Sequence, residues 1–220
     1  RTRGGVQIWQ MVSCMSWVGP RHSKVLTNHF GIRTPLTAYH DFSDDSATAQ
    51  LLDQLMAGSA VALISDAGTP VIADPGYRLV KLARRQGIPV VAVPGPCAIV
   101  AALSVSGLPT DRFTFEGFLP NKHEARLKKL EALAHDPRTL VFYEAPHRIL
   151  ATLQAMSTVL GPERQVVIGR ELTKRFETFI SGSVGEVAAC VQADPNQQRG
   201  EMVLVVQGWQ GSPDGADQIK

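Results

Sequence analysis

At 220 residues, the chain is long enough to bury a sizeable hydrophobic core, in one large domain or two small ones. Its apolar fraction of 44%, charged fraction of 19% and net charge of +2 are those of an ordinary globular protein and exclude a strongly basic chain, so any RNA-binding surface must be local. No apolar run approaches the roughly twenty residues that span a bilayer. Residues 1–20 lack the apolar core and cleavage site of a signal peptide. We therefore expect a cytoplasmic protein with no membrane segment.

The three cysteines, Cys14, Cys97 and Cys190, are widely spaced and odd in number. They show neither metal-ligand spacing nor a disulfide framework, which fits a reducing compartment. The histidines of the first forty residues fit no metal-binding motif either. We expect no metal site.

The first part of the chain predicts little regular structure. Residues 1–20, RTRGGVQIWQMVSCMSWVGP, show no clear hydrophobic period, and no element is expected there. Residues 21–30 are compatible with a helix because their apolar side chains fall at helical spacing. Residues 46–56 predict a better helix, with three leucines along one side and Gly58 after its end.

A βαβ unit is predicted next. Two short apolar runs, 61–65 and 88–93, each stop at a loop of small and turn-forming residues, as strands buried on both faces do. Between them, residues 74–86 predict a helix with Asp74 as its cap and Pro75 at its first position. The two loops fall at the carboxyl ends of the strands, where open α/β sheets bind ligands.

The loop after the first run, SDAGTP, has two interpretations. In the functional one, Asp66 accepts hydrogen bonds from ligand hydroxyl or amino groups, while Ala67 and Gly68 let the backbone approach closely. In the structural one, the segment is a tight turn in which Asp66 caps a helix. Spacing alone does not choose between them.

The loop after the second run, PGPCA, holds two prolines that stiffen it and open the following helix, expected at 97–106. A rigid turn that merely packs is the more usual meaning of such a loop. Cys97 follows a proline at a helix start, where a thiol pKa can be lowered, but no pattern pairs it with a base. We therefore interpret Cys97 as a small packing residue near a ligand.

The pattern changes near residues 108–114, where we place a boundary between an amino-terminal α/β domain (21–110) and a second α/β domain (111–210). The alternating phenylalanines of 112–118 predict an antiparallel or edge strand, in a more mixed sheet. Residues 211–220 are expected to form a mobile tail because they are rich in glycine, proline and aspartate. The remaining elements expected are helix 123–135, strand 139–144, helix 147–160, strands 165–170 and 175–181, helix 184–192 and strand 201–207.

Two charged segments, YEAPHR and RELTKRFE, each follow an apolar strand and concentrate charge at its carboxyl end. One interpretation is a salt-bridge network between strand ends. The other is a polar cleft that holds a phosphodiester substrate and tunes a base. The basic segment 121–130 can contact phosphates, although a charged surface helix is its more usual meaning. The charged residues of the two segments that matter here are Glu144, His147, Arg148, Arg170, Glu171, Lys174 and Arg175.

Three common catalytic signatures are missing from the sequence. No GxGxxG follows a predicted strand, and no GxxxxGK[ST] is present, which disfavours dinucleotide and P-loop nucleotide binding. No GxSxG elbow supports a hydrolase.

Taken together and in order, the motifs of this chain resemble the tetrapyrrole methylase superfamily, and within it the branch that acts on small-subunit ribosomal RNA. The likeness covers residues 21–208, most of the chain. One such motif alone is weak, but eight in the same order are highly specific. They are RHSKVL, HFGIRTPLTAYHD, SDAGTPVIADPGYRLV, PGPCA, SGLPTDRFTFEGFLP, YEAPHR, RELTKRFE and GEMVLVV.

The resemblance implies two α/β domains of the tetrapyrrole methylase type, with S-adenosylmethionine (SAM) in the cleft between them, in a homodimer. It implies methylation of the ribose 2′-hydroxyl of a cytidine in the decoding region of small-subunit (16S) ribosomal RNA. Carried over by position, the cofactor contacts are Asp66, Ala67, Gly68, Thr69, Cys97 and Ala98 in the first domain and Phe142, Tyr143 and Met202 in the second.

Methyl transfer from a sulfonium is an in-line displacement in which the enzyme mainly positions the two partners. A ribose hydroxyl is a poor nucleophile at neutral pH, so a base or a nearby cation should help. The sequence does not choose among the candidates. Those for the base or cation are Glu144, Glu171 and Lys174, and those for gripping the flanking phosphates are Arg148, Arg170 and Arg175.

The chain departs from the family pattern at both ends. Members begin with a strand and a Pro-Ile-Gly-Asn loop of the cofactor site, which residues 1–20 do not resemble. They also carry a small helical domain that has no counterpart here after Gly208. Two alternatives therefore stay open: a catalytically impaired remnant that still binds SAM or RNA, and a methylase of a small tetrapyrrole or of a protein side chain. The charged segments favour an anionic polymer over a tetrapyrrole.

Overall fold

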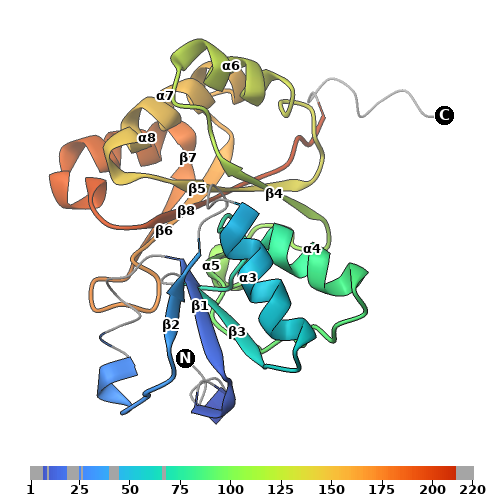
Figure 1. Ribbon diagram of the computed structural model, residues 1–220. Helices are drawn as coiled ribbons and strands as arrows, with labels where there is room; N and C mark the ends of the chain where they lie inside the picture. Colours follow the sequence, from blue (N-terminus) through green and yellow to red (C-terminus); the bar gives the residue numbers. More distant parts are fainter. Residues whose placement is uncertain are drawn as a thin grey trace. The chain divides into compact units, whose positions relative to one another are not determined.

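The structure of the protein is a computed structural model that describes residues 7–8, 10–18, 25, 27–39, 45–65 and 68–211 (Figure 1). The tail predicted at 211–220 lies outside these residues except for Gly211, and of the helix predicted at 21–30 only residues 25 and 27–30 are described. The chain divides into two compact units, Arg1–Cys97 (unit 1) and Ala98–Lys220 (unit 2), and each is described by itself. Within the described residues, no helix is long and apolar enough to cross a membrane.

Unit 1 is built on a three-stranded parallel sheet with the order β2-β1-β3. The central strand β1 (Cys14–Val18) pairs with β2 (Leu36–Ala38) on one side and with β3 (Val61–Ser65) on the other. Helix α3 (Asp45–Met56) leads into β3, and helix α4 (Tyr77–Arg85) follows it. The predicted helix before β3 and β3 itself are confirmed.

Each face of this sheet carries its own apolar cluster. Met15 of β1 packs with Ile64 of β3 in one cluster. Leu51 of α3 and Leu79 of α4 belong to the other, against which Leu63 of β3 packs. Because successive residues of a strand point to opposite faces, the clusters lie on opposite sides of β3. The two helices cover the side of Leu63.

Strand β1 lies in a segment where the sequence predicts no regular element. Met15 and Ser16 are both fully buried, so the strand is covered on both faces. Pairing with two neighbours, rather than an alternating pattern of its own, decides the structure of these five residues.

The prediction of a strand at residues 88–93 is wrong. The segment has no strand in the structure, and Val90, Val91 and Val93 are 42, 80 and 41% exposed. An apolar run becomes a strand only where a neighbour completes its backbone hydrogen bonds. Among the described residues the sheet ends at β3, so this run has no partner there.

Helix α4 begins later than predicted, and Asp74 is not its cap. The N-cap is Gly76, which has a φ of 130° and makes no capping hydrogen bond through a side chain. Asp74 instead accepts a hydrogen bond from the hydroxyl of Ser65 at the end of β3. A β-carbon at position 76 would lie 2.5 Å from Leu63 Cδ2, so only glycine lets this turn pack against the strand.

Unit 2 holds a five-stranded mixed sheet with the order β4-β5-β8-β6-β7. Strand β4 lies at the edge, as predicted, but runs parallel to β5, with a bulge between Phe115 and Phe118. The other neighbouring pairs are antiparallel. The strands are β4 (Phe113–Phe118), β5 (Thr139–Glu144), β6 (Gln165–Arg170), β7 (Thr178–Ser183) and β8 (Met202–Val206).

Because β5 and β6 both run antiparallel to β8, they end on the same side of the sheet, and β4 ends there too. Strands β7 and β8 begin on that side. We call this side the strand-end rim. Every charged segment that the sequence singles out in unit 2 follows a strand that ends at this rim.

Helices cover both faces of the unit 2 sheet. The face with Phe142 and Leu204 forms the main core with α6 (His123–Glu131), α7 (Ile149–Leu160) and α8 (Val184–Ala193) (Figure 1). Helix α5 (Ala98–Ser106) contacts β8 and β6 and belongs to unit 2. Two short 3-10 helices, η1 (Pro146–Arg148) and η2 (Pro195–Gln198), precede α7 and follow α8.

Replacing Gly76 by alanine should destabilise unit 1 by about 2–5 kcal/mol, because it adds both an unfavourable φ and a clash with Leu63. Gly58→Ala is the matched control: its φ is +87° but nothing lies within 4 Å of the added carbon, so it should cost about 1 kcal/mol. Urea unfolding of the two variants measures the difference. Equal losses would show that the turn at residue 76 is not packed against β3.

Candidate functional site

Three segments that the sequence singles out meet at the strand-end rim of unit 2. Met202, the first residue of β8, is paired in register with Glu144 at the end of β5 and with Arg170 at the end of β6. Residues paired across a sheet point to the same face. Their exposed fractions are only 2% for Glu144, 3% for Met202 and 9% for Arg170. Residues predicted for catalysis, cofactor contact and RNA binding thus form one buried row.

The carboxylate of Glu144 is surrounded by donors from three segments. Oε1 accepts the N–H of Ala145 at 2.8 Å, and Oε2 accepts the hydroxyl of Thr152 in α7 at 2.5 Å. Arg148 Nε lies 3.1 Å from Oε1, as an ion pair without the alignment of a hydrogen bond. These partners offset the loss of water around a buried anion. Both carboxylate oxygens of Glu144 are already engaged. Glu144 is therefore better suited to hold Arg148 in place than to take a proton from a substrate.

Arg148 extends this cluster to the loop after β4. Its Nη1 donates to Asn121 Oδ1 and its Nη2 to the carbonyl of Leu119. From α6, Arg126 donates to the carbonyls of Pro120 at 3.2 Å and Asn121 at 3.0 Å. Two guanidinium groups therefore fix the backbone of this loop at the rim.

A second ion-pair network lies at the end of β6. Lys174 Nζ lies 3.0 Å from Glu171 Oε1 and 2.9 Å from Glu201 Oε2. Glu171 Oε1 also accepts the N–H of Glu201 at 2.7 Å. A β-carbon on Gly200 would lie 2.4 Å from Glu171 Cγ, so glycine leaves room for the carboxylate. The network ties the loop after β6 to the start of β8.

The charges of this network are mutually stabilised. Burial raises the pKa of the Glu171 carboxyl, but the N–H of Glu201 and the Lys174 ammonium outweigh burial and hold that pKa below its ordinary value. Burial lowers the pKa of Lys174, but its hydrogen bonds to Glu201 and Glu171 outweigh burial and hold it above its ordinary value. Both groups are therefore charged at neutral pH, and neither has the pKa near 7 that best suits a general base.

The two remaining arginines of this segment differ in exposure. Arg170 donates to the carbonyl of Phe176 at 3.1 Å and to the Thr178 hydroxyl at 2.8 Å, and its Nε is buried without a hydrogen-bond partner among the described residues. Arg175 is exposed, and its guanidinium carbon lies 5.5 Å from the centre of the Phe176 ring. Arg170 thus anchors the loop after β6, whereas Arg175 faces solvent.

In unit 1, the two loops predicted to bind a ligand lie side by side. Thr69 Oγ1 donates to the carbonyl of Pro96 at 3.0 Å. Gly68 has a φ of +84°, and a β-carbon there would lie 3.4 Å from the same carbonyl oxygen. The SDAGTP and PGPCA segments therefore approach one another through backbone.

The other predicted cofactor contacts of these two loops are only partly described. Cys97 is half-buried with a free thiol, and Ala98 is the first residue of α5. Asp66 and Ala67 lie outside the described residues, so their predicted roles stay predictions.

The three cofactor contacts predicted in unit 2 are divided between the faces of the sheet. Phe142 is fully buried, and Met202 lies with it in the main core, so their side chains face the helices. Tyr143 points to the opposite face and is half-buried. Its ring makes edge contacts with Phe115, at 4.8 Å between centres, and with Phe118, at 5.8 Å.

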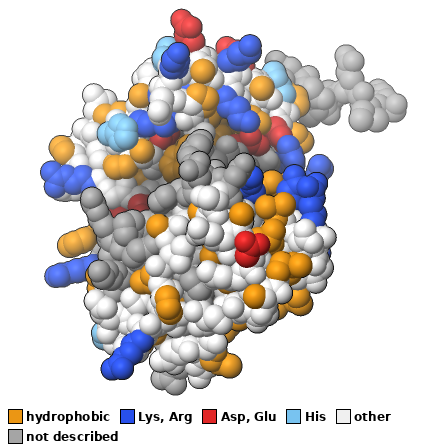
Figure 2. Space-filling model, in the orientation of Figure 1, with side chains coloured by type: hydrophobic (Ala, Val, Ile, Leu, Met, Phe, Trp, Pro, Cys, Tyr) orange, Lys and Arg blue, Asp and Glu red, His pale blue; other side chains and the backbone are white. Residues whose placement is uncertain are grey.

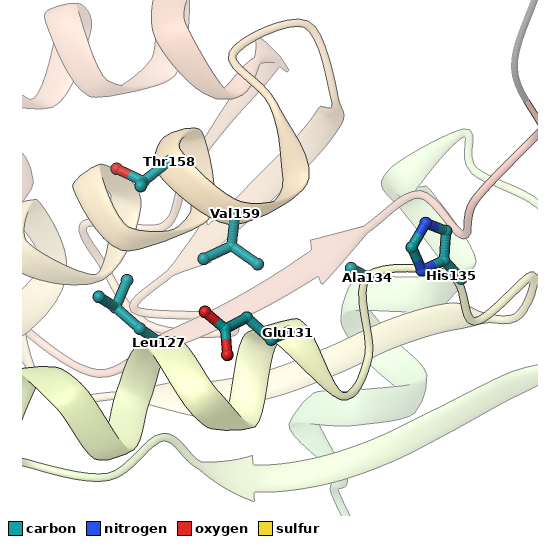
Figure 3. A pocket seen from close by; sticks show the side chains of 6 residues that line it. All are labelled: Leu127, Glu131, Ala134, His135, Thr158 and Val159. Atoms are coloured by element: carbon teal, nitrogen blue, oxygen red, sulfur yellow. The ribbon is translucent and has the colours of Figure 1, made fainter.

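A shallow pocket of about 390 Å³ lies between the carboxyl ends of α6 and α7 (Figure 3). These helix ends lie on the side where β5 begins, opposite the strand-end rim. None of the predicted site residues lines it. The lining residues are Leu127, Glu131, Ala134, His135, Thr158 and Val159.

Sequence reasoning missed several residues that organise the rim. Thr152 and Asn121 bind the Glu144–Arg148 pair from separate segments, and no local pattern marks them. Glu201 lies in the GEMVLVV segment, whose pattern shows only a strand. The acidic residue next to Gly200, directly before a buried strand, was the available signal for the network with Lys174.

Residues 15–188 match the family model of the tetrapyrrole (corrin/porphyrin) methylases. The chain belongs to this family. It is 50% identical over 214 residues to the ribosomal RNA small subunit methyltransferase I of Pseudomonas aeruginosa, an alignment covering 97% of this chain and 76% of the relative. The Escherichia coli O157:H7 protein of the same name is 48% identical over 207 residues, which cover 94% and 72% of the two chains. The resemblance drawn from the sequence motifs is confirmed.

Solved structures with low sequence identity share the fold. Cobalt precorrin-4 methyltransferase superposes with a TM-score of 0.66 at 15% identity, covering 94% of this chain and 88% of that one. Uroporphyrin-III C-methyl transferase from Thermus thermophilus, complexed with S-adenyl homocysteine, gives 0.59 at 19% identity, covering 94% and 90%. These likenesses confirm the α/β fold class of the methylases.

Lys174→Met should raise the pKa of Glu171, because the ammonium is one of the groups that hold it below the ordinary value of 4.5. In the wild type, the contribution of Glu171 to stability is present above that value and is lost as pH falls through the lower folded value; the contribution of Lys174 is present below 10.5 and is lost as pH rises through its raised value. Carboxyl ¹³C NMR titration measures the shift, with Lys128→Met on α6 as control. An unchanged Glu171 pKa would contradict the network.

Proposed function

We propose that the protein is a SAM-dependent methyltransferase that methylates the ribose 2′-hydroxyl of a cytidine in small-subunit (16S) ribosomal RNA, as a cytoplasmic homodimer. The observation that carries this is the 50% identity over 214 residues to a protein named for that activity class. Relatives of the same name from several bacteria share 44–52% identity. Below 25% identity the tetrapyrrole enzymes support the fold alone, so they do not favour the small-molecule alternative.

The loops of unit 1 fit the cofactor. The close approach of Gly68 to the Pro96 carbonyl leaves a backbone-lined corner with little side-chain bulk, which suits a flat adenosyl group. In this proposal Gly68, Thr69, Cys97 and Ala98 hold SAM, with Asp66 and Ala67 by position. For Phe142, Tyr143 and Met202 of unit 2, the cofactor contact that the resemblance implies by position stays a prediction. SAM supplies an electrophilic methyl group on a sulfonium.

The rim of unit 2 carries the groups that act on the nucleophile. Glu171 Oε1 is engaged, but no described residue hydrogen-bonds to Oε2, which leaves that oxygen to accept the ribose hydroxyl and orient it. Lys174 Nζ, on a side chain 45% exposed, stabilises negative charge on the ribose oxygen as this oxygen bonds to the methyl carbon and its proton passes to water. Glu144 acts by holding Arg148.

Phosphate binding falls to the arginines of the rim. Arg175 is exposed and free to move onto a phosphate. Arg148 and Arg170 use most of their N–H groups in hydrogen bonds to the loops after β4 and β6. They therefore hold those loops in place and add positive charge to the rim. The exposed guanidinium of Arg175 thus lies outside the two that hydrogen-bond to the loops.

The test of the function is a methylation assay with labelled SAM on three substrates: small ribosomal subunits, free small-subunit RNA and a tetrapyrrole. Label in the ribose of one cytidine supports the proposal. Label in the tetrapyrrole alone supports the small-molecule alternative. Calorimetry that detects SAM binding without any transfer would favour the impaired remnant.

Glu171→Gln should lower turnover by about 10- to 100-fold, because an amide oxygen accepts and orients the ribose hydroxyl less strongly than a carboxylate does. The affinity for SAM should stay within about twofold in calorimetry. Glu163→Gln, an exposed site just before β6 on the side opposite the rim, is the matched control and should keep wild-type turnover. Full activity of Glu171→Gln would remove this residue from the mechanism.

Thr69→Val should weaken SAM binding about two- to tenfold, because it removes the hydrogen bond that joins the two loops while keeping the side-chain volume. RNA binding, measured by filter retention, should not change. A loss of RNA binding with SAM affinity intact would place these loops at the RNA rather than at the cofactor.

A further inference from the structure

Phe176, in the loop between β6 and β7, exposes 65% of its surface, more than any other described phenylalanine. Apolar rings are normally buried on folding, because contact with water is unfavourable. Nothing in the hydrophobic core of unit 2 uses this ring. Its exposure leaves the ring available to a partner outside the chain.

The exposure is not the result of a loose loop. The carbonyl of Phe176 accepts hydrogen bonds from Arg170 Nη2 at 3.1 Å and from the Thr178 hydroxyl at 3.2 Å. Glu177 Oε2 accepts the N–H of Thr173 at 2.6 Å across the loop. The backbone is held on both sides of the ring, so the ring is presented in advance of binding.

The same loop stores backbone strain. Glu171 and Thr173 both have positive φ, at 52° and 63°, which is unfavourable for residues with a side chain. The ion pairs of Lys174 with Glu171 and Glu201 keep the first of them in this conformation. Unfavourable backbone conformations are concentrated at functional sites, so a strained loop that exposes an apolar ring is a candidate binding site.

A cation lies over the ring. The guanidinium carbon of Arg175 is 5.5 Å from the ring centre, and among the described side chains it has no acidic partner within 4 Å. Lys174, by contrast, is neutralised by two carboxylates. Figure 2 shows apolar and basic side chains projecting together in the region of this loop. An exposed aromatic face next to an unpaired guanidinium matches a nucleobase and its phosphate.

We propose that Phe176 is a stacking platform for an unpaired base of the RNA substrate, with Arg175 binding the adjacent phosphate. This inference rests on the proposed function. It identifies Phe176 as the residue that selects single-stranded RNA next to the target ribose. Stacking on an aromatic ring accepts any base and requires that the base be out of a helix. The rim then binds a looped or open strand in preference to a duplex.

The test compares Phe176→Ala and Phe176→Trp with Phe113→Ala. Phe113 is 44% exposed at the start of β4, on the side of the sheet opposite the rim, so it controls for loss of an exposed ring. The probe is a single-stranded 12-nucleotide RNA containing 2-aminopurine, whose fluorescence falls on stacking. KM and kcat for small-subunit RNA are measured in parallel.

Phe176→Ala should weaken RNA binding and raise the KM for RNA about 5- to 150-fold, the contribution of one stacked base, and abolish the fluorescence quench. Phe176→Trp should keep both, and Phe113→Ala should match the wild type. Wild-type binding and quenching by Phe176→Ala would overturn the platform. So would a change of oligomeric state in light scattering, which would assign the ring to a second copy of the chain.

The outcome also separates this inference from the function on which it rests. A wild type that methylates small-subunit RNA while Phe176→Ala behaves identically overturns the platform alone. A wild type that neither binds the probe nor methylates RNA overturns the proposed function and the platform with it.

Discussion

The carboxylate of Glu144 is the group around which the strand-end rim is built. It is only 2% exposed, and an anion removed from water is unfavourable unless donors replace the water. Here the donors come from the residue after β5, from η1 and from α7, and Arg148 carries the connection on to the loop after β4. One buried charge thus sets the relative positions of four segments.

The same logic repeats two strands away with the signs reversed. There the cation Lys174 is held between Glu171 and Glu201, and the in-register row of Glu144, Met202 and Arg170 runs from the first network toward the second. Fixed charges of both signs make a rim that does not need to reorganise when a charged substrate arrives. Both networks are salt bridges between strand ends, which is one of the two interpretations of the charged segments in the sequence. The other interpretation, a polar cleft for a phosphodiester, then concerns the groups that these networks leave exposed, such as Arg175.

The sequence predicts the elements of unit 2 well because their signals are local. Buried strands such as β5 and β6 are uninterrupted apolar runs, and their predicted bounds agree with the structure. Prediction failed where the secondary structure of a segment depends on strand partners that are distant in the sequence. The run at 88–93 has the composition of a strand but no neighbour among the described residues, and β1 forms in a segment without a pattern because β2 and β3 pair with it.

For the site residues, too, local signals were predictable and contacts with distant segments were not. Charge clustered after a strand located the rim, since parallel strand ends must meet on one side of a sheet. Which group does what was not predictable, because it depends on contacts across the sheet: Thr152 engages Glu144, and Asp74 binds Ser65 instead of capping a helix. The opposite faces of Phe142 and Tyr143 follow from alternation along β5, and which face the helices cover requires the fold.

Native-state hydrogen exchange of Glu144→Gln tests the role of the buried charge most directly. The variant keeps the side-chain shape but removes the anion that holds Arg148. Faster exchange is expected for the amides of residues 119, 121–123, 145 and 147–149, with the amides of β6 unchanged. A folded variant in which residues 119 and 121–123 exchange at the wild-type rate would contradict the role of Glu144.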